Sequence, residues 1–137
     1  MMEKTMLETV RSSFNRIDTH PGGWDHFTQR FYVTLFAMRD DTREVFAHAD
    51  NGNDDRLLRG FRDLVNSLAD GTSTIDELHL LGRTHHGYGL QPEHYLAVGT
   101  ALAMTLIEIS DYDDWPPHFD QAWRTIYAQM ASIMIRA

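Results

Sequence analysis

The sequence predicts an all-helical protein, and three observations support this fold class. Apolar residues recur at spacings of three and four along most of the chain, beginning with Leu7, Val10, Phe14 and Ile17. No segment has the strict alternation of apolar and polar residues that is typical of a strand. Turn-forming clusters, such as Asp-Thr-His-Pro-Gly-Gly at 18–23, separate the periodic segments.

The individual elements follow from these signals in chain order. The first helix carries the apolar face that includes Phe14 and Ile17. A second helix is expected over about 24–38, followed by a short segment after an N-cap at 40–42. The next helix starts at Asp54 or Asp55 and ends at 70–73, and another runs from the cap Thr74 to His85. The last two helices begin at Pro92 and at about His118. With 137 residues, the chain is expected to form a single domain over residues 1–137.

Composition excludes several classes of protein. A net charge of −8 would repel a phosphate backbone, so we expect no nucleic-acid partner. The absence of cysteine excludes a disulfide framework, a zinc–thiolate site, an iron–sulfur cluster and a cysteine nucleophile. The longest uncharged apolar run, 97–107, is too short to span a bilayer, and the N-terminus has no signal-peptide core. These features predict a soluble, cytoplasmic protein without a membrane partner.

His85 is the most informative candidate for a metal ligand. It closes an amphipathic segment and is followed by a glycine-rich turn, so its ring can face a pocket. The chain lacks the His-x-x-x-His and repeated Glu-x-x-His patterns of zinc proteases and carboxylate-bridged metal pairs. A single histidine suits haem iron. From spacing alone, a solvated histidine at a helix end is the more common alternative, just as Tyr32 and Phe46 could be ordinary core aromatics.

Several segments, taken together, resemble the bacterial globins. They are Phe31-Tyr32-x-x-Leu35-Phe36, then Phe46, then Leu81-Gly-Arg-x-His85-x-Gly-Tyr-Gly, then Pro92-Glu-x-Tyr95-x-x-Val98-Gly99, then Ala122-Trp123-x-x-x-Tyr127. More narrowly, the chain is similar to the globin module of flavohaemoglobins and to their single-domain relatives. The resemblance runs from about residue 28 to residue 135 and implies the globin fold, a 3-on-3 helical sandwich.

The resemblance implies a role for each matched residue around haem b (iron protoporphyrin IX). His85 matches the proximal iron ligand, and Tyr32 matches the distal tyrosine whose hydroxyl donates to bound dioxygen. Phe46 matches the phenylalanine that stacks on the porphyrin, and Leu58 matches the distal aliphatic residue beside the gas. Tyr95 matches the tyrosine that supports the proximal histidine. The expected walls of the porphyrin slot are Leu81, Val98 and Leu102.

Two departures from the family pattern affect the expected chemistry. The distal position that carries glutamine in close relatives falls on Asp54 or Asp55, where a carboxylate would repel an electron-rich gas ligand unless it is protonated or turned to solvent; Tyr32 would then act alone. In relatives whose proximal histidine donates electron density strongly to the iron, that histidine is paired with a glutamate late in the last helix. The chain stops at Ala137, before that position, which makes peroxidase-like activation less expected.

The resemblance therefore implies a globin that binds dioxygen reversibly, and nitric oxide or carbon monoxide as well. If the protein turns over, the implied reaction is nitric oxide dioxygenation with electrons from a separate reductase. A gas-sensing or redox-sensing module without turnover is the alternative. A third reading is a helical structural protein that has lost the porphyrin. The sequence leaves open whether the protein is a monomer or a homodimer.

Overall fold

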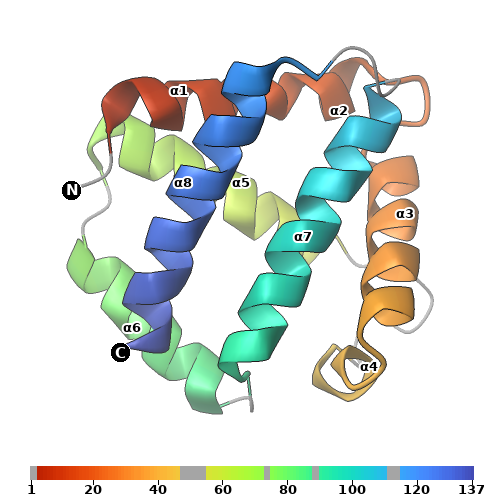
Figure 1. Ribbon diagram of the computed structural model, residues 1–137. Coiled ribbons are helices and arrows are strands. Elements are labelled where there is room, and N and C mark those ends of the chain that lie inside the picture. Colours follow the sequence, from red (N-terminus) through yellow and green to blue (C-terminus); the bar gives the residue numbers. More distant parts are fainter. Residues whose placement is uncertain (1–2, 47–54, 73–74, 88–89, 111–114) are drawn as a thin grey trace.

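The computed structural model describes residues 3–46, 55–72, 75–87, 90–110 and 115–137 (Figure 1). Within these ranges the regular structure is entirely helical, which confirms the predicted fold class. The helices are α1 (Lys4–Ser13), α2 (Asn15–Thr19), α3 (Gly23–Met38), α4 (Thr42–Val45), α5 (Arg56–Asp70), α6 (Ile75–Gly87), α7 (Pro92–Ile109) and α8 (Pro117–Ile135).

The long helices pack as two layers. In one layer, α7 lies beside both α3 and α8, and α7 and α8 run antiparallel (Figure 1). In the other layer, α1 packs on α5, which leads into α6. Contacts of α8 with both α1 and α6 join the layers. This arrangement is the expected 3-on-3 sandwich.

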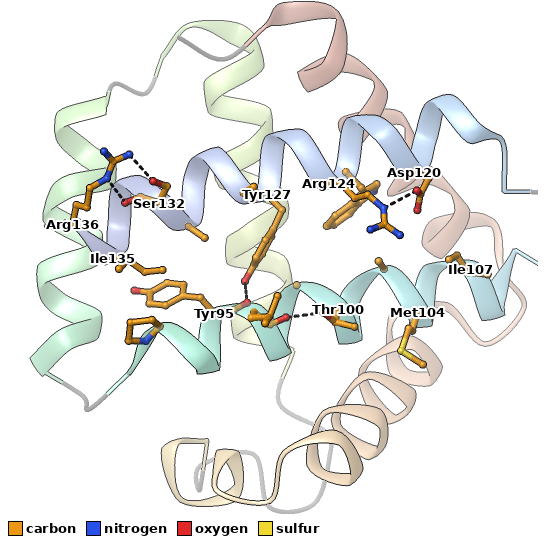
Figure 2. A pocket seen from close by; sticks show the side chains of 17 residues that line it. Tyr95, Thr100, Met104, Ile107, Asp120, Arg124, Tyr127, Ser132, Ile135 and Arg136 are labelled. Atoms are coloured by element: carbon orange, nitrogen blue, oxygen red, sulfur yellow. Dashed lines mark hydrogen bonds and ion pairs between the residues drawn. The ribbon is translucent and has the colours of Figure 1, made fainter.

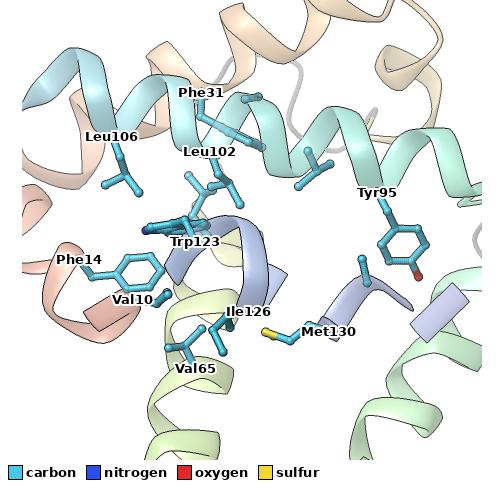
Figure 3. Close-up of a cluster of buried hydrophobic side chains, with 14 of the residues drawn as sticks. Val10, Phe14, Phe31, Val65, Tyr95, Leu102, Leu106, Trp123, Ile126 and Met130 are labelled. Atoms are coloured by element: carbon cyan, nitrogen blue, oxygen red, sulfur yellow. The ribbon is translucent and has the colours of Figure 1, made fainter. Parts of the chain in front are cut away.

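The interior is built from the apolar faces that the helical periodicity predicts. Figure 3 shows Val10 and Phe14 near Trp123 and Ile126 of α8. The Trp123 ring lies 5.8 Å from the Phe14 ring and 5.7 Å from the Phe61 ring, measured between centroids. Aromatic pairs at these separations stabilise a core beyond their buried area. The cluster therefore fixes α1, α5 and α8 relative to one another.

The first helix differs from the prediction because it is divided at Phe14 into α1 and α2. The hydroxyl of Ser13 donates to the Val10 carbonyl at 2.6 Å, and the Phe14 N–H donates to the Arg11 carbonyl at 3.2 Å. The backbone bond spans three residues instead of four, as in a tightened helical turn, and the Ser13 hydroxyl bonds a carbonyl of the preceding turn. Both features accompany the interruption of the helix at Phe14. Apolar periodicity alone does not reveal this break.

None of the helices in the described ranges is both long enough and apolar enough to cross a membrane. Two large apolar side chains of α7 are exposed: Leu96 is 72% exposed and Met104 is 50% exposed, and both line a groove between α7 and α8. They lie on a helix whose other face is part of the core.

Candidate functional site

The predicted distal tyrosine lies in the interior among aromatic rings. Tyr32, on α3, is 2% exposed. Its ring centroid is 5.0 Å from that of Phe31, 5.5 Å from that of Phe36 and 6.4 Å from that of Phe46. Phe46 directly follows α4 and is itself buried, so this short helix places it against Tyr32. The structure thus brings together two residues that are fourteen positions apart.

The predicted walls of the slot belong to the same apolar cluster as Tyr32. Leu58 lies on α5, and Tyr95, Val98 and Leu102 lie on α7; all four are buried. Leu81, on α6, is partly buried and packs against this cluster. The predicted site residues with described side chains therefore come from α3, α4, α5, α6 and α7 and share one interior.

The predicted iron ligand lies on the expected element. His85 is near the end of α6, which stops at Gly87. The side chain of His85 lies outside the described residues, and so do Asp54, Tyr88 and Gly89. Ligation of iron by His85 therefore stays a prediction.

Asp55, the second candidate for the distal glutamine position, has a partner on its own helix. It occupies the N-cap position of α5, and its Oδ2 accepts a hydrogen bond from Arg59 Nε at 2.5 Å. This pairing with the next turn of α5 offsets the negative charge of the carboxylate. The carboxylate is 29% exposed, so solvent screens it further.

Tyr95 is held by a second tyrosine that crosses from α8. Figure 2 shows Tyr127 reaching α7, where its hydroxyl donates to the Tyr95 carbonyl at 2.6 Å. The Tyr127 ring fits because residue 99 is glycine: a Cβ there would lie 2.4 Å from a ring carbon. Burial raises the pKa of the Tyr127 hydroxyl well above its usual range, so it remains a proton donor. The sequence motif included Tyr127 but assigned it no role.

A cavity of about 600 Å³ opens between α7 and α8 next to this tyrosine pair (Figure 2). Tyr95 and Tyr127 line it together with Trp123, Ala131 and Ile135. Tyr95 therefore contacts both this groove and the interior cluster. Burial raises the pKa of the Tyr95 hydroxyl, which keeps it in the neutral, hydrogen-bonding form.

A polar cluster of Arg39, Asp41 and His94, which the sequence analysis missed, joins the turn before α4 to the start of α7. His94 is only 5% exposed, and its Nε2 lies 3.0 Å from Oδ2 of Asp41. Arg39 contributes an ion pair to Asp41, with Nε and Oδ1 2.9 Å apart. The available sequence signal was the Gln91–His94 spacing, because the structure has a capping box between these two residues.

The fold and this interior define a class of all-helical proteins whose two helical layers enclose a buried phenol within apolar and aromatic walls. Residues 29–134 match the family model described as Globin. The chain belongs to the globin family, which implies a haem protein that binds gaseous ligands. The predicted globin fold and the predicted family are confirmed.

Curated relatives point to the same part of the family. The chain is 30% identical to a flavohemoprotein of Candida albicans over 79% of this chain and 28% of the relative. It is 29% identical to a flavohemoprotein of Pseudomonas putida over 84% of this chain and 30% of the relative. A flavohemoprotein of Bacillus subtilis is 24% identical over 98% of this chain and 34% of the relative. The chain thus spans about a third of the length of these proteins.

Proposed function

We propose that this chain is a haem b globin that binds dioxygen reversibly and also takes nitric oxide and carbon monoxide. The observation that carries the proposal is the buried Tyr32 phenol, which lies among Phe31, Phe36 and Phe46 in the interior of a globin fold. The bound haem supplies an iron that binds diatomic gases. We also propose a single globin domain over residues 1–137 and a cytoplasmic location, which the acidic, cysteine-free composition supports.

The residues present fit a flat, largely apolar cofactor. Aromatic and aliphatic side chains from five helices face one interior, and they exclude water from it. In this proposal, Phe46 stacks on the porphyrin, and Leu58, Leu81, Val98 and Leu102 form its walls. His85 supplies the iron ligand, and Tyr95 supports that histidine.

Tyr32 provides the polar contact within this apolar interior. Its phenol hydroxyl would donate to a gas ligand that carries partial negative charge. Such a bond is stronger in a water-excluded site than in solvent, because the local dielectric is low. Tyr32 would therefore slow the escape of dioxygen, which fits a protein that holds the gas reversibly.

The direct test is an absorption spectrum of the haem-loaded protein in the ferric, ferrous and oxygenated forms. His85→Ala should lose the pigment or its normal ligation. His79→Ala, a change on the same helix α6, is the matched control and should keep the wild-type spectrum. An unchanged spectrum in His85→Ala would remove the ligand assignment.

A second measurement addresses Tyr32. Tyr32→Phe keeps the ring that packs against Phe31 and Phe36 but removes the hydroxyl. It should retain the pigment and release dioxygen about tenfold faster, the effect of losing one hydrogen bond worth about 1.4 kcal/mol. A dissociation rate equal to that of the wild type would contradict the donor role.

For the chemistry, we propose nitric oxide dioxygenation in which one nitric oxide, one dioxygen and one electron give one nitrate ion. The electron would come from a separate reductase. Mixing the oxygenated protein with nitric oxide should yield nitrate in equal amount, measured after a single turnover. A protein that binds both gases but produces no nitrate would instead support the sensing alternative.

A further inference from the structure

His94 uses both nitrogens of its buried ring. Nδ1 accepts the backbone N–H of Gln91 at 2.9 Å, so this nitrogen carries no proton. The ring proton is therefore on Nε2, which donates to Oδ2 of Asp41 at 3.0 Å. One bond closes the capping box of α7, and the other reaches a different element. A Glu or Gln is the usual residue at this cap position. His94 makes the same cap and also a second hydrogen bond, to Asp41.

The hydrogen bond between His94 and Asp41, here called the bridge, joins two segments that each lead directly to a residue of the proposed haem site. Asp41 directly precedes α4, and Phe46 directly follows it. His94 lies in the first turn of α7 and is followed by Tyr95. Arg39 reinforces the connection, because it lies 2.9 Å from Asp41 and its Nη2 lies 3.7 Å from Oε1 of Glu93.

We infer that the Asp41–His94 hydrogen bond positions Phe46 and Tyr95 relative to each other and so sets how firmly the haem is retained. This inference rests on the proposed function, because Phe46 and Tyr95 are site residues only if haem is bound. Asp41 and His94 are positioning residues: they act through the two aromatic residues. Fixed supporting hydrogen bonds of this kind hold contact residues in the geometry that a bound group needs.

A matched pair of variants separates the bridge from the helix cap. His94→Gln and His94→Glu both keep a side-chain oxygen for the Gln91 N–H. The glutamine can also donate to Asp41, whereas the glutamate places a second carboxylate against it. Helix α7 remains capped in both variants, and an acidic residue in the first turn suits the helix dipole. Any difference between the two variants reports on the contact with Asp41.

Two further variants complete the experiment. The double variant His94→Glu with Asp41→Asn reverses donor and acceptor, because the asparagine amide can donate to the glutamate. Glu108→Gln weakens another link between α3 and α7, in which Arg30 Nε lies 2.8 Å from Oε1 of Glu108. Glu108 is at the far end of α7 from Tyr95, so this variant controls for a general loss of contact between these helices.

The measurement is the rate of haem transfer from each loaded protein to an excess of apomyoglobin, followed by absorbance. His94→Glu should lose haem about tenfold faster than the wild type, the effect of breaking one buried hydrogen bond. His94→Gln, the reversed pair and Glu108→Gln should stay within about threefold of the wild type. Urea unfolding of each haem-free protein should show that every variant is fully folded under the conditions of the transfer, with His94→Glu less stable than the others because it loses a buried hydrogen bond.

Each outcome bears on the inference. A wild-type rate in His94→Glu overturns it while leaving the haem proposal intact, because the loaded protein itself supplies the signal. Fast haem loss in the reversed pair also overturns it, since the effect would then follow from the residue change and not from the bridge. If the wild type takes up no haem, the proposed function fails, and the inference fails with it.

Discussion

At the scale of single residues, Gly99 decides how closely α7 and α8 approach. The Tyr127 ring occupies the space that a side chain at position 99 would need. This close approach allows the Tyr127 hydroxyl to bond the Tyr95 carbonyl. The glycine is therefore a packing requirement within a helix, where glycine otherwise weakens stability.

We predict that Gly99→Ala destabilises the protein by about 1–3 kcal/mol, because the new Cβ overpacks the interface and displaces Tyr127. The matched control is Gly60→Ala in α5, where an added Cβ meets no atom within 4 Å. The free energy of unfolding of that variant should rise by about 0.5–1 kcal/mol, because alanine restricts the conformations of the unfolded chain. Urea unfolding measures both, and equal effects at the two glycines would contradict the packing role of residue 99.

Ser13 is a second residue whose role is specific. Its buried hydroxyl donates to the Val10 carbonyl and accepts the Trp123 indole N–H at 2.8 Å. Ser13→Ala should lower the free energy of unfolding by about 1–3 kcal/mol, because the indole N–H is left buried without an acceptor. Ser12→Ala removes an exposed hydroxyl and should be nearly neutral. Equal unfolding midpoints for the two variants would show that the indole bond contributes nothing.

His94 marks the limit of prediction at this scale. A histidine with a carboxylate neighbour in sequence, Glu93, suggests a surface pair, yet its ring is buried and bonds Asp41, 53 positions earlier. The Gln91–His94 spacing could have indicated the cap, but it contains no information about a partner on another element. Such partners follow only from how the helices pack.

At the scale of elements, most helix limits follow from local signals. Pro92 at the first position of α7 and Gly71 with a φ of 76° after α5 are a start and a stop that the sequence displays. The division at Phe14 was missed because it depends on the Ser13 hydroxyl, whose other partner, Trp123, is 110 residues away. Local propensity predicts where helices lie, and distant contacts decide where they are interrupted.

The contact between Asp41, just before α4, and His94 of α7 predicts that the free energy of unfolding depends on pH. The hydrogen bond from His94, followed by the interaction with Arg39, lowers the pKa of Asp41 below its ordinary value of 3.8. A group whose pKa is lower in the folded state stabilises the fold above its unfolded pKa, and this contribution disappears as the pH falls through its folded pKa. The stabilisation from ionised Asp41 should therefore be present near neutrality and lost in acid.

Asp41→Asn tests this dependence because it removes the ionisable group and keeps a similar shape. The stability difference between wild type and Asp41→Asn, from urea unfolding, should be constant from about pH 7 to about pH 5 and shrink below about pH 4. Asp40→Asn, at the exposed neighbouring carboxylate, is the control and should show no comparable change. A difference that grew on acidification would contradict the direction of the pKa shift.

At the scale of the whole molecule, the candidate site depends on five helices at once. The order Tyr32, Phe46, Leu58, Leu81, Tyr95 is spread over α3 to α7, and each residue alone is compatible with an ordinary core position. The joint pattern predicted the family correctly, because the spacing between matched segments reflects the globin packing. The finer chemistry depends on the relative placement of side chains, which spacing does not determine.

A cofactor held by so many elements should stabilise the entire fold. A ligand that binds the folded state alone raises the free energy of unfolding by RT ln(1 + [L]/Kd), or about 2.7 kcal/mol at a hundredfold excess over Kd. We therefore predict that hemin raises the urea midpoint of the wild type well above that of the haem-free protein. Iron-free protoporphyrin IX should raise it less, because it can stack on Phe46 but cannot bond His85. In His85→Ala the two compounds should have the same, smaller effect, and equal stabilisation of wild type and His85→Ala by hemin would contradict ligation by His85.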